Sequence, residues 1–249
     1  MLSVFNVAAA EGRRLKTGFW PLFFGIETVV FAVVGTWMQA ASWQLGDGSN
    51  ENVGALLPWV GTSSLFVGVT VCNALLRGAV TRADSNYLRS TRDRLVSAAV
   101  HVLLSLVISA AVVCLGVATG LIVRALFGFP FVERDPVAML AWICQAAMVA
   151  WLECLVGLCI GYASRSFGAA AVTMALVSLG VPGGILALPV TACGFKAAGT
   201  WLVENQPNTW FAVLARDGVL NGPTLAVVTV FCAVLVFALL VIAARRKLK

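Results

Sequence analysis

Charge is scarce in this sequence, and that scarcity excludes most soluble folds. Only 11% of the 249 residues are Asp, Glu, Lys or Arg, whereas 60% are hydrophobic. A soluble domain needs roughly a quarter of its residues charged to cover its surface. We therefore expect lipid to be the main solvent of this chain, and we predict a single all-α integral membrane domain over residues 1–249.

Motifs for catalysis, nucleotide binding and metal binding are also missing. The sequence has no GxxxxGK[ST] phosphate-binding loop, no HExxH motif and no GxSxG motif. Its seven cysteines form no CxxC pair, and its single histidine, His101, has no second ligand at metal-binding spacing. We expect His101 to be a hydrogen-bonded helix residue. The chain is predicted not to be an enzyme and to hold no metal and no cofactor.

What the sequence does contain is a series of apolar blocks, each long enough for one membrane-spanning helix of about 20 residues. Six transmembrane spans are predicted, at about 19–42, 55–76, 98–126, 137–163, 169–189 and 222–244. Residues 1–18 are amphipathic and basic, which favours an interfacial helix over the alternative of a disordered tail. The Trp-rich segment 190–221 is predicted to dip into the outer leaflet as short helices.

The basic residues predict the orientation of these spans. If both termini are cytoplasmic, 13 of the 17 basic residues lie inside: three in 10–18, five in 77–97, Arg165 and four in 245–249. This asymmetry agrees with the positive-inside rule. A multi-pass protein of the cytoplasmic membrane with both termini inside is therefore predicted.

Two acidic residues fall within the apolar blocks. A charged residue at the bilayer centre costs roughly 2.5–3.5 kcal/mol on insertion scales, so each needs an explanation. Glu153, near the middle of its block, is the better candidate for a substrate path or proton relay, protonated or hydrogen-bonded inside the bundle. Glu27 is a second candidate, but it is also shallow enough to reach the interface or pair with a basic residue of segment 1–18.

The fifth block is broken by two prolines and two glycines, Pro182, Gly183, Gly184 and Pro189. Proline removes a backbone donor and glycine weakens a helix, and freed backbone groups in lipid must face protein or water. One interpretation is the hinge of an outer gate, and the other is simply the end of the span. Two GxxxG pairs, Gly116 with Gly120 and Gly157 with Gly161, are candidates for close helix contacts.

This arrangement resembles the permease subunits of ABC-2 type exporters. The resemblance rests on AEGRRLKTGFW (10–20), on RADSNYLRSTRDRLVSA (82–98) and on the broken LGVPGG (179–184) with its Trp-bearing continuation. It covers the whole chain and is architectural. Within the family, the size and the 82–98 region are most similar to permeases of bacterial lantibiotic- or bacitracin-type self-immunity exporters.

The resemblance implies a fold and a mechanism. It implies an N-terminal elbow helix, re-entrant helices between spans five and six, and a cytoplasmic coupling helix between spans two and three. Separate P-loop ATPase subunits would bind ATP and Mg²⁺, dock on the coupling helix and drive a pair of permease subunits, identical or related. The docking residues would be Arg82, Asp84, Tyr87, Leu88, Arg89, Arg92 and Arg94. Arginine suits this role because it pairs in a bidentate manner with carboxylates.

We therefore predict a transport subunit that exports an amphipathic or lipid-like cargo, with an antimicrobial peptide as the first candidate. Two alternatives remain from the residues themselves. One is an ATP-independent carrier that uses Glu153 as its proton site. The other is a non-transporting docking or signalling protein whose basic stretch is a solvated loop or binds anionic lipid. No partner of the nucleic-acid class is predicted.

Overall fold

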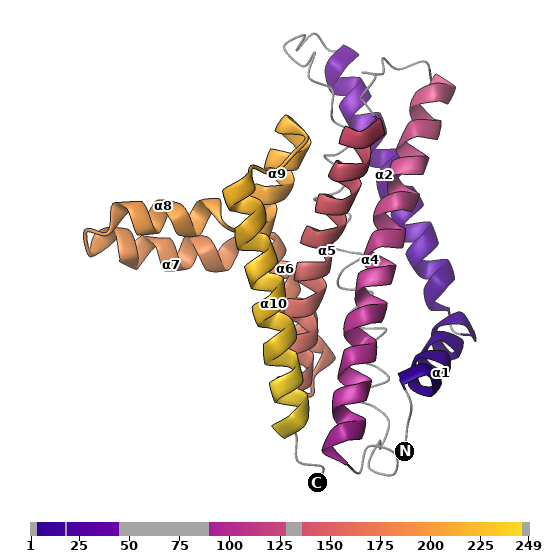
Figure 1. The fold of residues 1–249 in the computed structure, drawn as a ribbon. Helices are drawn as coiled ribbons and strands as arrows, with labels where there is room; N and C mark the ends of the chain where they lie inside the picture. Colours follow the sequence, from indigo (N-terminus) through magenta and orange to yellow (C-terminus); the bar gives the residue numbers. More distant parts are fainter. Residues whose placement is uncertain (1–3, 18, 45–89, 128–135, 246–249) are drawn as a thin grey trace.

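The chain folds as a bundle of long helices from which a shorter helical hairpin projects sideways (Figure 1). This computed structural model describes residues 4–17, 19–44, 90–127 and 136–245, and every regular element in those ranges is an α-helix. The all-α prediction is confirmed for these ranges. The predicted second span, 55–76, lies outside them.

Four long helices build the bundle. They are α2 (Trp20–Gln44), α4 (Thr91–Phe127), α5 (Pro136–Ser164) and α10 (Gly222–Arg245). Helix α2 packs on α4, α4 packs on α5, and α10 packs on both α4 and α5. Because α5 also contacts the shorter helices α6 and α9, it forms the centre of the bundle, and it is the most buried of the long helices α4, α5 and α10.

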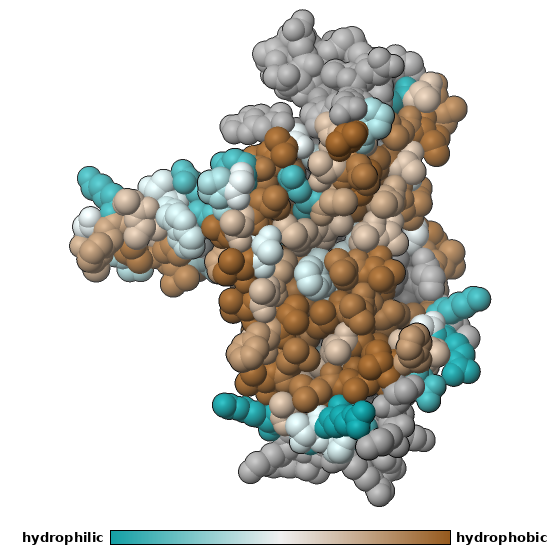
Figure 2. Space-filling view, in the orientation of Figure 1, coloured by the Kyte–Doolittle hydropathy of each residue, from teal (hydrophilic) through white to brown (hydrophobic). Residues whose placement is uncertain are grey.

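Three of these helices, α4, α5 and α10, are long and apolar enough to cross a membrane. In α2 the apolar stretch is shorter and covers Gly25–Trp37. A bent pair of helices, α6 and α7, would make a fourth crossing if it counted as one span. Figure 2 shows a broad hydrophobic surface over the bundle with hydrophilic residues gathered toward its ends. The chain is therefore a membrane-associated protein, and the described residues contain three or four helical segments that could cross a membrane.

The helix α4 begins earlier than the sequence suggested. The third span was predicted to start at Ala98, after a separate coupling helix, but α4 starts at Thr91 and runs without a break for 37 residues. Ser90 caps it: its hydroxyl accepts a hydrogen bond from Asp93 N (3.1 Å) and donates one to the Asp93 carboxylate (2.7 Å). Such a reciprocal cap satisfies backbone donors of the first turn and fixes the start of a helix.

The predicted fifth span, 169–189, is not a straight helix. Helix α6 (Phe167–Ser178) ends at a turn in which Gly180 has a φ of 73°, and α7 (Val181–Ala192) then leaves at an angle of 63°. The predicted break is confirmed, because Gly180 adopts the left-handed conformation and Pro182 suits the first turn of a new helix. Twelve residues of α6 rise only about 18 Å, short of the roughly 30 Å hydrocarbon core.

Helices α7 and α8 (Lys196–Glu204) form the projecting hairpin, which we call the arm. Helix α9 (Pro207–Asp217) follows the arm and packs against α5 before the chain enters α10. The prediction of short helices in 190–221 is confirmed. The arm leaves the bundle near the level of the first turns of α10 (Figure 1).

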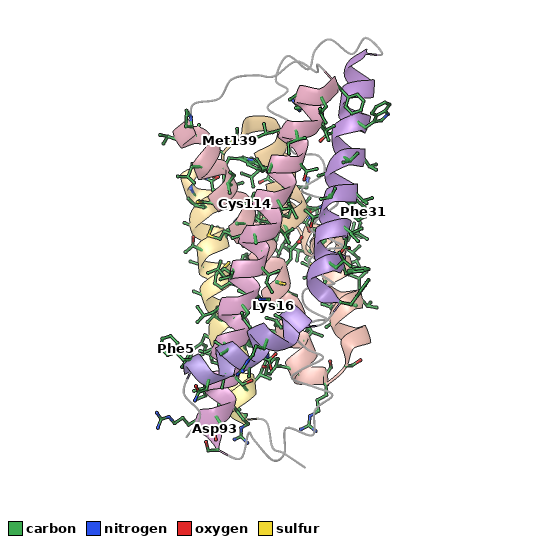
Figure 3. All side chains as sticks on the ribbon, turned by 90° about the vertical axis from the view of Figure 1, so that its right-hand side faces the viewer. Phe5, Lys16, Phe31, Asp93, Cys114 and Met139 are labelled. Atoms are coloured by element: carbon green, nitrogen blue, oxygen red, sulfur yellow. The ribbon has the colours of Figure 1, made fainter. Side chains whose placement is uncertain are left out.

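Helix α1 (Val4–Thr17) crosses the bundle at one end, against α4 and α2. Figure 3 shows it running between Phe5 and Lys16 at the end of the bundle where Asp93 lies, with Met139 at the opposite end. Leu15 is buried against the bundle, whereas Phe5 is 85% exposed. The predicted N-terminal helix is present, and the alternative of a disordered tail is wrong for residues 4–17.

Candidate functional site: a buried polar seam between α4 and α5

One face of α4 carries polar side chains at every fourth position. His101, Ser105 and Ser109 are spaced four residues apart, so they lie one above the other on the same side of the helix. All three are buried, with exposed fractions of 1%, 0% and 5%. We call this stripe and its partners on α5 the polar seam. Polar groups buried in an apolar bundle require hydrogen-bond partners, and α5 supplies them.

At the α1 end of the bundle, His101 meets Tyr162 of α5. The Nδ1 atom of His101 and the hydroxyl of Tyr162 share a hydrogen bond of 2.5 Å, and the two rings meet edge to face with centroids 5.9 Å apart. Tyr162 is itself only 4% exposed. The expectation that His101 is a hydrogen-bonded helix residue is confirmed, and its partner lies 61 residues away in the sequence.

One turn further along α4, Ser105 meets Trp151. The indole Nε1–H donates to Ser105 Oγ (3.1 Å) and to the Val102 carbonyl (3.3 Å), while the Ser105 hydroxyl donates to the same carbonyl (2.8 Å). Trp151 thus binds a backbone carbonyl of α4 as well as a side chain. This bridge between α4 and α5 holds the two spans in register.

The third contact of the polar seam joins Ser109 to Cys154, the residue that follows Glu153 in the chain. Ser109 is the central residue of α4, and its side chain is hydrogen-bonded to the Cys154 thiol of α5, next to Glu153. Glu153 is 1% exposed and Cys154 is fully buried. The prediction that Glu153 lies inside the bundle is confirmed by this burial. A carboxyl at this place is costly on its own, so the polar neighbours of the seam matter to it.

The other predicted buried acid belongs to a different contact. Glu27 is half-buried on α2, beside Thr28, which is fully buried. Thr28, Ala32 and Thr36 form a buried stripe of small side chains along α2, the helix that packs on α4. Glu27 therefore lies on α2, whereas Glu153 lies on α5.

The predicted gate residues lie in the arm and away from the seam. Pro182 starts α7 and Pro189 lies inside it, both exposed. A Cβ on Gly183 would lie 2.9 Å from the Leu202 carbonyl of α8, whereas Gly184 faces open space. The geometry fits the interpretation that the break ends a span better than it fits a gate hinge over the bundle.

Two of the predicted docking residues, Arg92 and Arg94, lie within the described residues, and the other five lie outside them. Arg82, Asp84, Tyr87, Leu88 and Arg89 lie outside the described residues. Arg92 is exposed in the first turn of α4. Arg94 is half-buried, and its Nη2 donates to Thr91 Oγ1 (3.0 Å) and to the Ala244 carbonyl (3.2 Å) in the last turn of α10. Arg94 therefore ties the start of α4 to the end of α10.

Sequence reasoning missed several members of the seam. Ser105, Ser109, Trp151, Cys154 and Tyr162 were not singled out, although the spacing of four between His101, Ser105 and Ser109 is visible in the sequence. All four glycines of the GxxxG pairs are buried, as a close helix contact requires. Near the other end of α5, Gln145 Oε1 accepts a hydrogen bond from Leu220 N (2.8 Å).

The chemistry available in the seam is that of an imidazole, a phenol, an indole, a thiol and two hydroxyls, and the Glu153 carboxyl adjoins the thiol in the chain. Within the described ranges, no group of three His, Cys, Asp or Glu side chains is placed to hold a metal ion. These groups can exchange protons and can hydrogen-bond to a passing polar group. Comparison with protein-family models, with curated proteins and with solved structures finds no match to this chain.

Proposed function

We propose that this chain is the membrane-spanning permease subunit of an ATP-driven exporter of the ABC-2 type, working as a pair with a second permease subunit. Its cargo would be amphipathic or lipid-like, with a cationic antimicrobial peptide as the first candidate. Separate P-loop ATPase subunits would dock on the cytoplasmic stretch 77–97 and supply the energy. Both termini would lie in the cytoplasm.

One observation carries this proposal: α4 joins the proposed docking stretch directly to the polar seam. Its first turns, with Arg92 and Arg94, belong to the basic stretch, and ten residues beyond Thr91 the same unbroken helix begins the seam at His101. A helix is a stiff element, so a displacement applied at its start is transmitted along its length to the residues that line the seam.

Arg94 gives this displacement a second route. Its hydrogen bond to the Ala244 carbonyl places a cation at the C-terminal end of α10, where the helix dipole favours positive charge. Movement of the α4 start would therefore shift α10 as well. Since α10 also packs on α5, all three long apolar helices α4, α5 and α10 respond to the same docking stretch.

A proton-coupled carrier is the second candidate function, and Glu153 is the observation that favours it. The carboxyl is 1% exposed inside the bundle and belongs to α5, the helix that also carries Tyr162. Groups that exchange protons, buried inside a membrane bundle, are typical of proton relays. In this candidate the seam itself would be driven by a pH gradient, with no ATPase.

Transport by reconstituted vesicles separates the two. We expect the protein, purified together with its ATPase, to move a fluorescently labelled cationic antimicrobial peptide when ATP is added, and Glu153→Gln to slow this movement at least about tenfold, the equivalent of roughly 1.4 kcal/mol. Glu153→Asp should retain partial activity, and Glu133→Gln, a carboxyl with no assigned role, should retain all of it. Movement that requires a pH gradient and ignores ATP would favour the carrier, and normal transport by Glu153→Gln would remove Glu153 from the cargo path.

A further inference from the structure

The arm formed by α7 and α8 is built as a rigid unit. A Cβ on Gly199 of α8 would clash with the Thr191 hydroxyl and lie 3.2 Å from the Ala187 carbonyl, so α8 approaches α7 closely at this point. At the other end of the hairpin, Gly183 of α7 approaches the Leu202 carbonyl equally closely. Close approach at small residues is the way that helices associate where lipid surrounds them.

The outer faces of the two helices differ in polarity. On α7, the large apolar side chains Ile185, Leu186 and Leu188 are 62%, 55% and 73% exposed. On α8, Lys196, Thr200 and Glu204 recur every fourth residue and are all exposed, which makes a polar stripe along that helix. The arm is therefore amphipathic across its thickness, with an apolar face on α7 and a polar stripe on α8.

The direction of this asymmetry matches that of the bundle. Figure 2 shows the hydrophobic residues of the arm along its lower edge, on the side of the hydrophobic surface of the bundle, and hydrophilic residues along its upper edge. The arm leaves near the first turns of α10, a helix whose 24 residues rise about 36 Å, close to the thickness of one hydrocarbon core with its boundaries (Figure 1). We take this level as the boundary between lipid and water.

We propose that the arm lies flat in the lipid–water interface and that its partner is phospholipid: α7 contacts acyl chains and α8 contacts headgroups. Both segments are α-helices, which pair most of their backbone polar groups internally as the apolar region demands, and Pro189 of α7 is the one interior position without an N–H to donate. Lys196 is placed to meet headgroup phosphates, and Trp201, 47% exposed on α8, is of the residue type that gathers at membrane interfaces. A second copy of this chain is the competing occupant of the apolar face. We favour lipid because the polar stripe of α8 runs along the same arm as the apolar face of α7. This stripe lies on the side of the arm away from the hydrophobic surface of the bundle.

Depth measurements with site-specific fluorophores test this placement. The exposed cysteines Cys114, Cys144 and Cys193, together with Cys72, are replaced by alanine, and the buried Cys154, Cys159 and Cys232 are kept. Leu188→Cys on α7 and Thr200→Cys on α8 are then labelled with bimane, one at a time, in the full chain reconstituted in phosphatidylcholine–phosphatidylglycerol vesicles. We expect a nitroxide on the acyl chain to quench position 188 at least twofold more than position 200, and a headgroup nitroxide to show the reverse order.

A third position makes every result informative. Phe237→Cys, 69% exposed on α10, reports on a lipid-facing site within a span and should be quenched by acyl-chain nitroxide alone. Quenching of positions 188 and 200 by aqueous iodide, without quenching by either lipid, would place the arm in water. Protection of position 188 from both lipids and iodide would show that protein covers α7. Either result overturns the proposal, as would iodide quenching at position 237. The inference does not rest on transport, so its failure would leave the exporter proposal standing.

Discussion

At the scale of single residues, the bundle depends on polar contacts that cross between helices. Trp151 binds Ser105 and the Val102 carbonyl, Tyr162 binds His101, and Arg94 binds the Ala244 carbonyl. None of these pairs is local in the sequence, which explains why the residues could be recognised as unusual without their partners being found. His101 was expected to be hydrogen-bonded, yet nothing in the sequence pointed to Tyr162.

The Trp151 bridge leads to a stability prediction. Trp151→Phe removes the indole donor to α4 and should lower the free energy of unfolding by roughly 1–2 kcal/mol, because a hydrogen bond in an apolar contact is lost along with some packing. The matched control is Trp201→Phe on the exposed side of the arm, which should change stability by less than about 0.5 kcal/mol. Thermal unfolding in detergent, followed by circular dichroism, measures both. Equal effects of the two substitutions would contradict the bridge.

Arg94 leads to a second prediction, on local opening. Arg94→Leu removes the hydrogen bond to Ala244 and the cation at the end of α10, a loss of roughly 1.5–3 kcal/mol for a charged donor. Amides in the last two turns of α10 should then exchange hydrogen about tenfold faster or more, as followed by mass spectrometry. Arg92→Leu, one of the exposed docking candidates, serves as the control and should leave α10 unchanged. If both variants exchange alike, Arg94 does not hold α10.

At the scale of elements, apolar length predicted the helices well and their ends poorly. The spans expected at 98–126, 137–163 and 222–244 correspond to α4, α5 and α10. The start of α4 was misplaced by seven residues because the charge of Arg92, Asp93 and Arg94 suggested a separate element, although Ser90 and Asp93 already form a helix cap. Composition marks where lipid begins, whereas capping residues mark where the helix begins.

The break after α6 also shows how far the sequence could predict an element. Proline and glycine in LGVPGG correctly predicted an interruption, but the direction of α7 depends on contacts that are remote in the sequence. Gly183 and Gly199 allow α7 and α8 to approach each other, and so the chain turns outward into the arm. The residues that were considered for an outer gate lie in α7 and so belong to this hairpin.

The arm provides a prediction with an internal control. Gly199→Ala places a Cβ against Thr191 and Ala187, and overpacking of this kind costs roughly 1–3 kcal/mol. Gly184→Ala places the same methyl in open space within a helix, where alanine is favoured over glycine by about 1 kcal/mol. Hydrogen exchange across α7 and α8 should therefore become faster in the first variant and slower or unchanged in the second. Slower exchange in Gly199→Ala would contradict the close packing of the arm.

At the scale of the whole molecule, the proposed function couples a membrane bundle to separate ATPase subunits. The scarcity of charge and the apolar blocks were enough to predict an all-helical membrane-associated protein, because lipid imposes few alternatives. The buried polar groups of the bundle could be predicted only in part: Glu153 stood out through its cost, while serines, tyrosine and tryptophan are common enough in membrane helices to pass unnoticed. The docking stretch is proposed from charge and from its continuity with α4.

The most direct test of this account is whether a P-loop ATPase binds the stretch that leads into α4. We predict that the tagged full chain, purified in mild detergent from its own cells, carries a P-loop ATPase in near-stoichiometric amount, and that the triple substitution Arg82→Glu, Arg89→Glu and Arg92→Glu removes it. Arg94 is kept, because it serves the contact with α10, and circular dichroism of the triple variant should match that of the unchanged chain. Absence of any P-loop ATPase, or its full retention by the triple variant, would contradict the central claim.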